Sequence, residues 1–154
     1  ARLSFLRGDD SNRSRRLLEE ALKQPFFEET TQARMYLGSL AFDENPKEGL
    51  AIWKEALLLD QQFKDAPRMW VRIASEYELI NDNQASISAW NKALSYESVQ
   101  NTAHLALGRL KIKIDPKAAL EHFQIVKSDT FMERTRAAEL GEKLAQWEIE
   151  KETQ

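Results

Sequence analysis

Histidine and cysteine, which often carry acid–base or metal chemistry, are rare in this sequence. The two histidines, His104 and His122, belong to no metal-binding spacing, and the chain has no cysteine. The missing cysteine excludes disulfides, thiolate metal sites and a cysteine nucleophile. An HExxH motif, a glycine-rich phosphate loop and a Gly-x-Ser-x-Gly turn are also absent from the sequence. We therefore predict that the protein is not an enzyme and that it holds no cofactor and no metal.

Charged residues are abundant and nearly balanced. The chain has 22 lysines and arginines against 25 aspartates and glutamates, for a formal net charge of −3. Such a balance argues against nucleic-acid binding, which calls for a basic patch or a strongly basic domain. Arg13, Arg15 and Arg16 form the one candidate phosphate site, but acidic residues flank them on both sides. We interpret this stretch as a solvated helix start.

The four tryptophans raise the question of a ligand-binding aromatic cage. Trp53, Trp70 and Trp90 fall at positions that pack one helix on another, so we assign them to the core. Trp147, near the end of the chain, is expected either to cover the end of the fold or to contact a continuing chain.

The periodicity of the apolar residues predicts an all-helical protein. They recur three and four residues apart almost throughout, and the chain contains only five glycines and four prolines. No apolar run approaches the roughly 20 residues that cross a bilayer, so direct membrane insertion is not expected. The expected helices span residues 14–24, 31–43, 46–60, 66–80, 84–96, 101–114, 116–127 and 130–151, after the end of a further helix at 3–7.

Two helix starts carry the same Asx-Pro signature. Asn45 precedes Pro46 and Asp115 precedes Pro116, which places a capping residue before proline at the first helical position. Glu48 stands where it would complete a capping box with Asn45. Short connectors of this kind predict that consecutive helices pack antiparallel.

A repeat of about 34 residues runs through the sequence. A large residue followed by a tiny one marks the first helix of each pair, and a bulky residue with a small one three positions later marks the second. The first series is Leu37-Gly38, Ile73-Ala74, Leu107-Gly108 and Leu140-Gly141. The second is Leu18 with Ala21, Trp53 with Ala56, Trp90 with Ala93, and Phe123 with Val126.

These repeats resemble the tetratricopeptide-repeat (TPR) family. Its pattern is Trp, two residues, Leu-Gly, two residues, Tyr, then Ala, three residues, Phe, and later Pro, over 34 residues. The middle unit matches best, with Trp70, Ile73-Ala74, Tyr77, Ser86, Trp90 and Ala93. Arg34 and His104 stand in place of the leading Trp in the other two units, and the closing Pro is absent from all three.

The resemblance implies an all-α fold, a right-handed α–α superhelix of stacked antiparallel helix pairs. We expect one domain over residues 1–154. It would comprise a half-repeat at 1–30, repeats at 31–64, 65–99 and 100–128, and a capping helix at 129–154. Because the chain starts at Ala1 without a methionine, we expect it to be part of a longer protein. The sequence leaves a cytoplasmic and a periplasmic location both open.

The inner wall of such a superhelix is lined by the first helix of each pair, on the side opposite the packing residues. The centre of that wall is basic and contains Arg68, Arg72, Arg109 and Lys113. An acidic strip on the last helix, Glu139 and Glu142, follows this basic centre. The candidate partner-binding residues are Tyr36, Arg68, Arg72, Ser75, Arg109 and Lys113. Arginine and tyrosine often dominate binding energy at interfaces, so we expect a protein or peptide partner, with an acidic segment at the basic centre. The alternative for each residue is a solvated helix face.

Two functions fit these observations. The first is a protein–protein interaction scaffold that binds a peptide or protein segment on its concave face. The second is a structural spacer or oligomerisation unit in a longer helical solenoid, and the sequence leaves the oligomeric state open.

Overall fold

The computed structural model describes residues 12–13, 15–17, 19–20, 23, 30–126 and 132–153. Over these residues the chain forms helices joined by short turns, with no strand. None of the described helices is long and apolar enough to cross a membrane. The expected helix end at 3–7 and the pair Leu18 and Ala21 lie outside the described residues.

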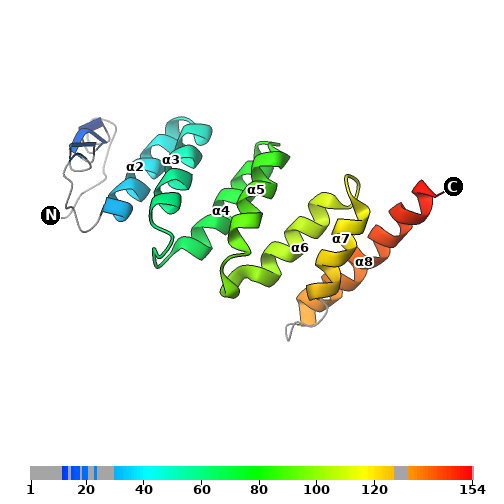
Figure 1. Cartoon of the computed structure of the whole chain (residues 1–154). Helices are drawn as coiled ribbons and strands as arrows, with labels where there is room; N and C mark the ends of the chain where they lie inside the picture. Colours follow the sequence, from blue (N-terminus) through cyan, green and yellow to red (C-terminus); the bar gives the residue numbers. More distant parts are fainter. Residues whose placement is uncertain are drawn as a thin grey trace. The chain divides into compact units, whose positions relative to one another are not determined.

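The chain divides into two compact units, Ala1–Ala66 and Pro67–Gln154. In the first, helix α2 (Thr30–Glu44) lies beside helix α3 (Pro46–Leu59), as Figure 1 shows. Only Asn45 separates the two helices, so they run antiparallel.

Trp53 is the centre of the α2–α3 pair. It is buried, its ring stacks on Phe42 with centroids 5.2 Å apart, and its Nε1 donates a hydrogen bond of 2.9 Å to the Met35 carbonyl. The two helices approach closely because Gly38 faces the Trp53 ring and Gly49 faces the backbone of Phe42. A β-carbon at either glycine would clash with these neighbours, which explains why the tiny residues of the repeat are needed.

The second unit contains five α-helices among its described residues (Figure 1). They are α4 (Ala66–Leu79, which starts one residue before the unit), α5 (Asn83–Ala93), α6 (Gln100–Lys111), α7 (Pro116–Val126) and α8 (Met132–Glu152). A short 3-10 helix, η1 (Glu97–Val99), links α5 to α6. Helices α6, α7 and α8 pack on one another, and α5 packs on α6.

The turn from α4 to α5 ends one helix and starts the next within three residues. Asn81 adopts a left-handed φ of 61°, and the Asp82 amide donates to the Tyr77 carbonyl at 2.9 Å, as in a Schellman C-cap. The Asp82 carboxylate then accepts from the Ala85 amide at 3.1 Å and caps α5. Helix α5 thus starts at Asn83, one residue before the predicted start at residue 84.

The Phe123 ring of α7 lies at the centre of the packing between α6, α7 and α8. Gly108 of α6 and Gly141 of α8 both face its ring, and a β-carbon on either would clash with it. Ala138 and Ala145 of α8 are fully buried in the same cluster. Small residues on two helices thus seat one large ring between them.

The predicted capping residues behave differently at the two Asx-Pro starts. Asp115 accepts a hydrogen bond of 3.2 Å from the Ala118 amide, as expected of an N-cap. Asn45 occupies the N-cap position of α3 but makes no side-chain cap bond. Glu48 binds Arg15 at 2.8 Å, so the predicted capping box is wrong. The Asn45 amide, which a capping box would bond to Glu48, donates instead to the Ala41 carbonyl at 2.7 Å.

Two predicted helices run three residues past the observed helix ends. The helix predicted at 84–96 ends at Ala93, because residues 97–99 form the 3-10 helix η1. The helix predicted at 101–114 ends at Lys111, and the Asp115 amide bonds the Lys111 carbonyl at 2.8 Å. Lys113 consequently lies in the turn between α6 and α7.

Candidate binding groove

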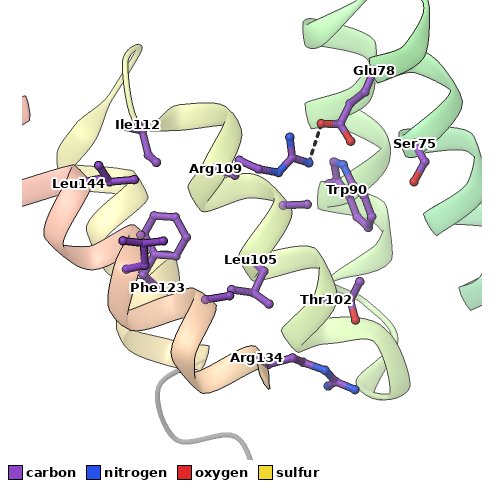
Figure 2. A pocket seen from close by; sticks show the side chains of 14 residues that line it. Ser75, Glu78, Trp90, Thr102, Leu105, Arg109, Ile112, Phe123, Arg134 and Leu144 are labelled. Atoms are coloured by element: carbon purple, nitrogen blue, oxygen red, sulfur yellow. Dashed lines mark hydrogen bonds and ion pairs between the residues drawn. The ribbon is translucent and has the colours of Figure 1, made fainter. Parts of the chain in front are cut away.

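A pocket of about 580 Å³ opens on the second unit, and we call it the unit 2 pocket (Figure 2). Its apolar wall comes from α6, α7 and α8 and includes Leu105, Ile112, Phe123, Leu140 and Leu144. Leu140 and Leu144 are 61% and 46% exposed, so much of this wall is in contact with water. An open apolar hollow of this size is typical of a binding site.

Polar side chains lie at the edge of the unit 2 pocket. Arg109 of α6 donates from Nη2 to Oε1 of Glu78 on α4 at 2.7 Å (Figure 2). The Arg109 side chain is 59% exposed and that of Glu78 19%, so water screens the pair and its contribution to stability is small. Arg134, at the start of α8, also lines the pocket. The charged groups of the lining therefore comprise two arginines and one glutamate.

Two aromatic residues from the second helices of their pairs reach the pocket. Trp90 of α5 and Phe123 of α7 are each 3% exposed, and both contribute to the lining. As predicted, Trp90 belongs to the core, and the pocket therefore rests on rigidly packed rings.

The indole nitrogen of Trp90 differs from that of Trp53, its equivalent in the first unit. Trp53 Nε1 donates to the Met35 carbonyl, whereas the buried Trp90 Nε1 has no hydrogen-bond partner among the described residues. Buried donors are nearly always paired. Trp90 is thus a local exception at the pocket.

Of the six predicted partner-binding residues, Ser75 and Arg109 line the unit 2 pocket. Ser75 donates from its hydroxyl to the Val71 carbonyl at 2.9 Å. The other four residues do not line the pocket. Arg68 and Arg72 are exposed on α4, Lys113 is exposed in the turn after α6, and Tyr36 is exposed on α2 in the first unit.

Helix α8 presents a different face to the pocket from the one that the repeat pattern predicted. Glu139 and Glu142 line a separate hollow of about 290 Å³. Gly141 is buried, but its neighbour Leu140 is largely exposed. Its equivalents Ile73 and Leu107 are fully buried. No helix among the described residues covers this side of α8.

The spacing of apolar residues in the sequence indicates this exposed wall, although the repeat pattern does not. Leu140, Leu144 and Trp147 follow one another at spacings of four and three residues, which puts them on one side of a helix. All three are exposed, and Lys151 lies over the Trp147 ring with Nζ 4.9 Å from its centroid. The last helix therefore has an apolar stripe in addition to its packing face.

The two histidines meet across the α6–α7 pair. The Nδ1 atoms of His104 and His122 lie 2.9 Å apart, and their ring centroids 5.2 Å apart. Burial lowers the pKa of both imidazoles. That of His122 falls to about 4, with Lys111 and His104 as further causes. The described residues contain no group of three or more histidine, aspartate or glutamate side chains placed to hold a metal.

The basic stretch near the start of the chain is ion-paired where the structure describes it. Arg15 contacts Glu19 at 3.3 Å, Glu44 at 3.5 Å and Glu48 at 2.8 Å. Arg13 and Arg16 are exposed. These contacts favour the predicted solvated helix start over a phosphate site.

Comparison with solved structures shows which fold this arrangement represents. A crystal structure of MamA protein superposes with a TM-score of 0.57 at 19% sequence identity, covering 92% of this chain and 79% of that one. A second MamA crystal structure gives a TM-score of 0.54 at 19% identity, covering 94% and 92%. The likeness confirms the predicted all-α helical-repeat solenoid and supports a TPR-like repeat. No family model matches the chain, and no curated protein matches it.

Proposed function

We propose that this chain is a protein-interaction scaffold, without catalytic activity of its own, that binds a peptide or protein segment in the unit 2 pocket. The observation that carries this proposal is the open apolar wall of the pocket, which residues such as Leu140 and Leu144 leave in contact with water. Covering the exposed part of one of these leucines would contribute about 1–2 kcal/mol of binding free energy. The face concerned includes Ser75 and Arg109, which the sequence assigned to the concave wall.

The charges around the pocket favour an acidic segment with apolar side chains. Arg109 and Arg134 outnumber Glu78 in the lining, and Arg68 and Arg72 are exposed on the neighbouring α4. Complementary charge mainly raises the association rate and fixes the orientation of a partner. In this proposal the apolar wall supplies most of the affinity. The arginines favour partner segments that carry acidic residues beside their apolar side chains.

Selection of peptides by phage display tests the proposal directly. A library of random twelve-residue peptides is selected on the 154-residue chain, and the recovered peptides are measured by fluorescence anisotropy. Thr102 lines the pocket, so Thr102→Trp should fill it and weaken binding at least tenfold. The matched control is Lys92→Trp, at an exposed position of α5 outside the pocket.

Two results would refute the proposal: recovery of no binding peptide, or equal binding by the Thr102→Trp and Lys92→Trp variants. The acidic preference has its own measurement. Arg72→Glu combined with Arg109→Glu should weaken acidic peptides by about 1 kcal/mol or more, with unchanged helicity by circular dichroism. Equal affinity after this double reversal would leave the pocket as a site without charge preference.

The alternative function is a structural or oligomerisation unit, which the exposed stripe on α8 supports. Leu140, Leu144 and Trp147 are too exposed for a helix that ends a solenoid with a polar outer face. Leu140 and Leu144 also line the unit 2 pocket, so the two functions share part of their surface.

A further inference from the structure

We infer that the exposed stripe of α8 pairs with the same stripe of a second copy of this chain, the two helices running antiparallel. The pairing would bury Ala137, Leu140 and Leu144, which also line the unit 2 pocket, so a second copy and a bound peptide would compete for them. The spacing, exposure and charge order of the α8 residues support the pairing.

The stripe has the spacing of a two-helix interface. Ala137, Leu140, Leu144, Trp147 and Lys151 are separated by three, four, three and four residues and are all exposed. This is the alternation of the a and d positions in a heptad, which keeps one side of a helix against a partner helix. We call these five residues the α8 stripe. It leaves Ala138, Gly141 and Ala145 on the other side, packed within the unit.

An antiparallel arrangement matches large residues with small ones along the α8 stripe. With the two-fold axis close to residue 142, Leu140 of each copy lies opposite Leu144 of the other, and Ala137 lies opposite Trp147. These are the a-to-d layers of an antiparallel helix pair. The small Ala137 leaves room for the indole ring.

The charges beside the α8 stripe select the antiparallel direction. Arg134 and Arg136 lie in the first half of α8, whereas Glu148 and Glu150 lie in the second half. Antiparallel pairing places Arg136 near Glu150 of the other copy on one flank, and Arg134 near Glu148 on the opposite flank. The two-fold axis repeats each contact, so the antiparallel pair offsets its one like-charge contact, between the two copies of Lys143, with four opposite-charge contacts. An in-register parallel pair makes only the contact of Lys143 with Glu148 of the other copy, twice.

Lys143 provides a second signature of the same register. It lies on the flank that carries Arg136 and Glu150, seven residues from each, so the two copies of Lys143 meet beside the two-fold axis. In the antiparallel pair Arg136 lies opposite Glu150 of the other copy. The Arg136 of that copy is 14 residues further along the helix, so the two Arg136 residues are about 20 Å apart. The interface of one helix pair is small, so a weak dimer with a Kd of about 1–100 µM is expected.

Sedimentation equilibrium and charge swaps test the pairing on the full 154-residue chain. We expect reversible dimerisation of the wild-type chain and at least tenfold weaker association of Glu150→Arg, with association regained when Arg136→Glu is added. The matched control is Lys92→Glu, a charge reversal at an exposed position of α5, which should leave association unchanged. Circular dichroism checks that each variant keeps its helicity.

Single cysteines then test the direction, since the natural chain has none. Under mild oxidation Lys143→Cys should form a disulfide-linked dimer, and Arg136→Cys should not. A chain that stays monomeric at 200 µM would refute the inference. It would also be refuted by a dimer that is insensitive to Glu150→Arg, or by equal cross-linking of the two cysteine variants.

Discussion

The Nδ1 atoms of His104 on α6 and His122 on α7 lie 2.9 Å apart. At this distance one Nδ1 must donate a proton and the other must accept it, so at least the accepting imidazole is neutral in the folded chain. Protonating either ring places a charge in a partly buried site, and protonating the accepting Nδ1 also removes the acceptor of the pair. The α6–α7 contact is therefore sensitive to pH between the ordinary pKa of histidine and the lowered pKa of His122.

We predict that the free energy of unfolding decreases as the pH falls from 7.5 to 4.5. The folded pKa of His122 is about 4, against an ordinary value of 6.5. Between these two pKa values the unfolded chain binds more protons than the folded chain. The contribution of His122 to the free energy of unfolding is therefore complete above about pH 6.5 and is lost as the pH falls toward 4. After allowance for solvent screening the loss is about 1–2 kcal/mol. Urea denaturation at a series of pH values measures it.

Carboxylates also titrate at the acidic end of this range, so a variant must isolate the histidine pair. We expect the combined change His104→Gln and His122→Gln to flatten the pH dependence between 5 and 7. If this variant shows the same slope as the wild-type chain, the histidine pair is not the source of the effect.

The equivalent tryptophans of the two units yield a second prediction. Trp53→Phe removes a buried hydrogen bond to the Met35 carbonyl, whereas Trp90→Phe removes a donor that has no partner among the described residues. Both changes remove the same ring atoms from a buried site. Trp53→Phe should therefore lower the free energy of unfolding by about 1 kcal/mol more than Trp90→Phe. Chemical denaturation followed by circular dichroism would show equal costs if Trp90 does bond in solution.

The two Asx-Pro helix starts provide a matched pair for the third prediction. Asp115→Ala removes a side-chain bond to the Ala118 amide and should cost about 1 kcal/mol of stability. Asn45→Ala removes a side chain that makes no cap bond, so its cost should stay within about 0.5 kcal/mol. Urea midpoints of the two variants measure the difference, and a larger loss for Asn45→Ala would contradict the observed cap geometry.

The repeat pattern was sufficient to predict the helical fold and the interior of the helix pairs. The tiny residues Gly38, Gly108 and Gly141 do sit against large rings, because close helix approach demands them wherever the pairs stack. Such a requirement is local and recurs at a fixed period, so it can be read from one sequence. Helix ends were less predictable, since the 3-10 helix η1 and the turn at Lys113 depend on backbone bonds that leave no distinct sequence pattern.

The pocket was only partly predictable from the sequence. The helical wheel placed Ser75 and Arg109 on one side of their helices, and both line the pocket. It could not place Trp90 or Phe123 there, because residues of the second helices reach the pocket only through the packing of three helices. The proximity of His104 and His122 was equally hidden, because the period of the repeat does not fix which residues of adjacent helices touch.

The same repeat position gives opposite environments in α6 and α8, and this leads to the last prediction. Leu107 is fully buried, whereas its equivalent Leu140 is 61% exposed. Leu107→Ala should lower the free energy of unfolding by about 2–5 kcal/mol, because it leaves a cavity in the core. Leu140→Ala removes an exposed side chain and should cost less than about 1 kcal/mol in the monomer.

Urea denaturation at low protein concentration compares these two leucines without contribution from self-association. A cost for Leu140→Ala close to that of Leu107→Ala would mean that a helix covers Leu140 in solution. In that case the apolar wall of the unit 2 pocket would be smaller than the structure indicates, and the α8 stripe would not be free to pair. A small cost at Leu140 combined with weaker dimerisation at high concentration would place the contribution of this side chain in the interface between copies.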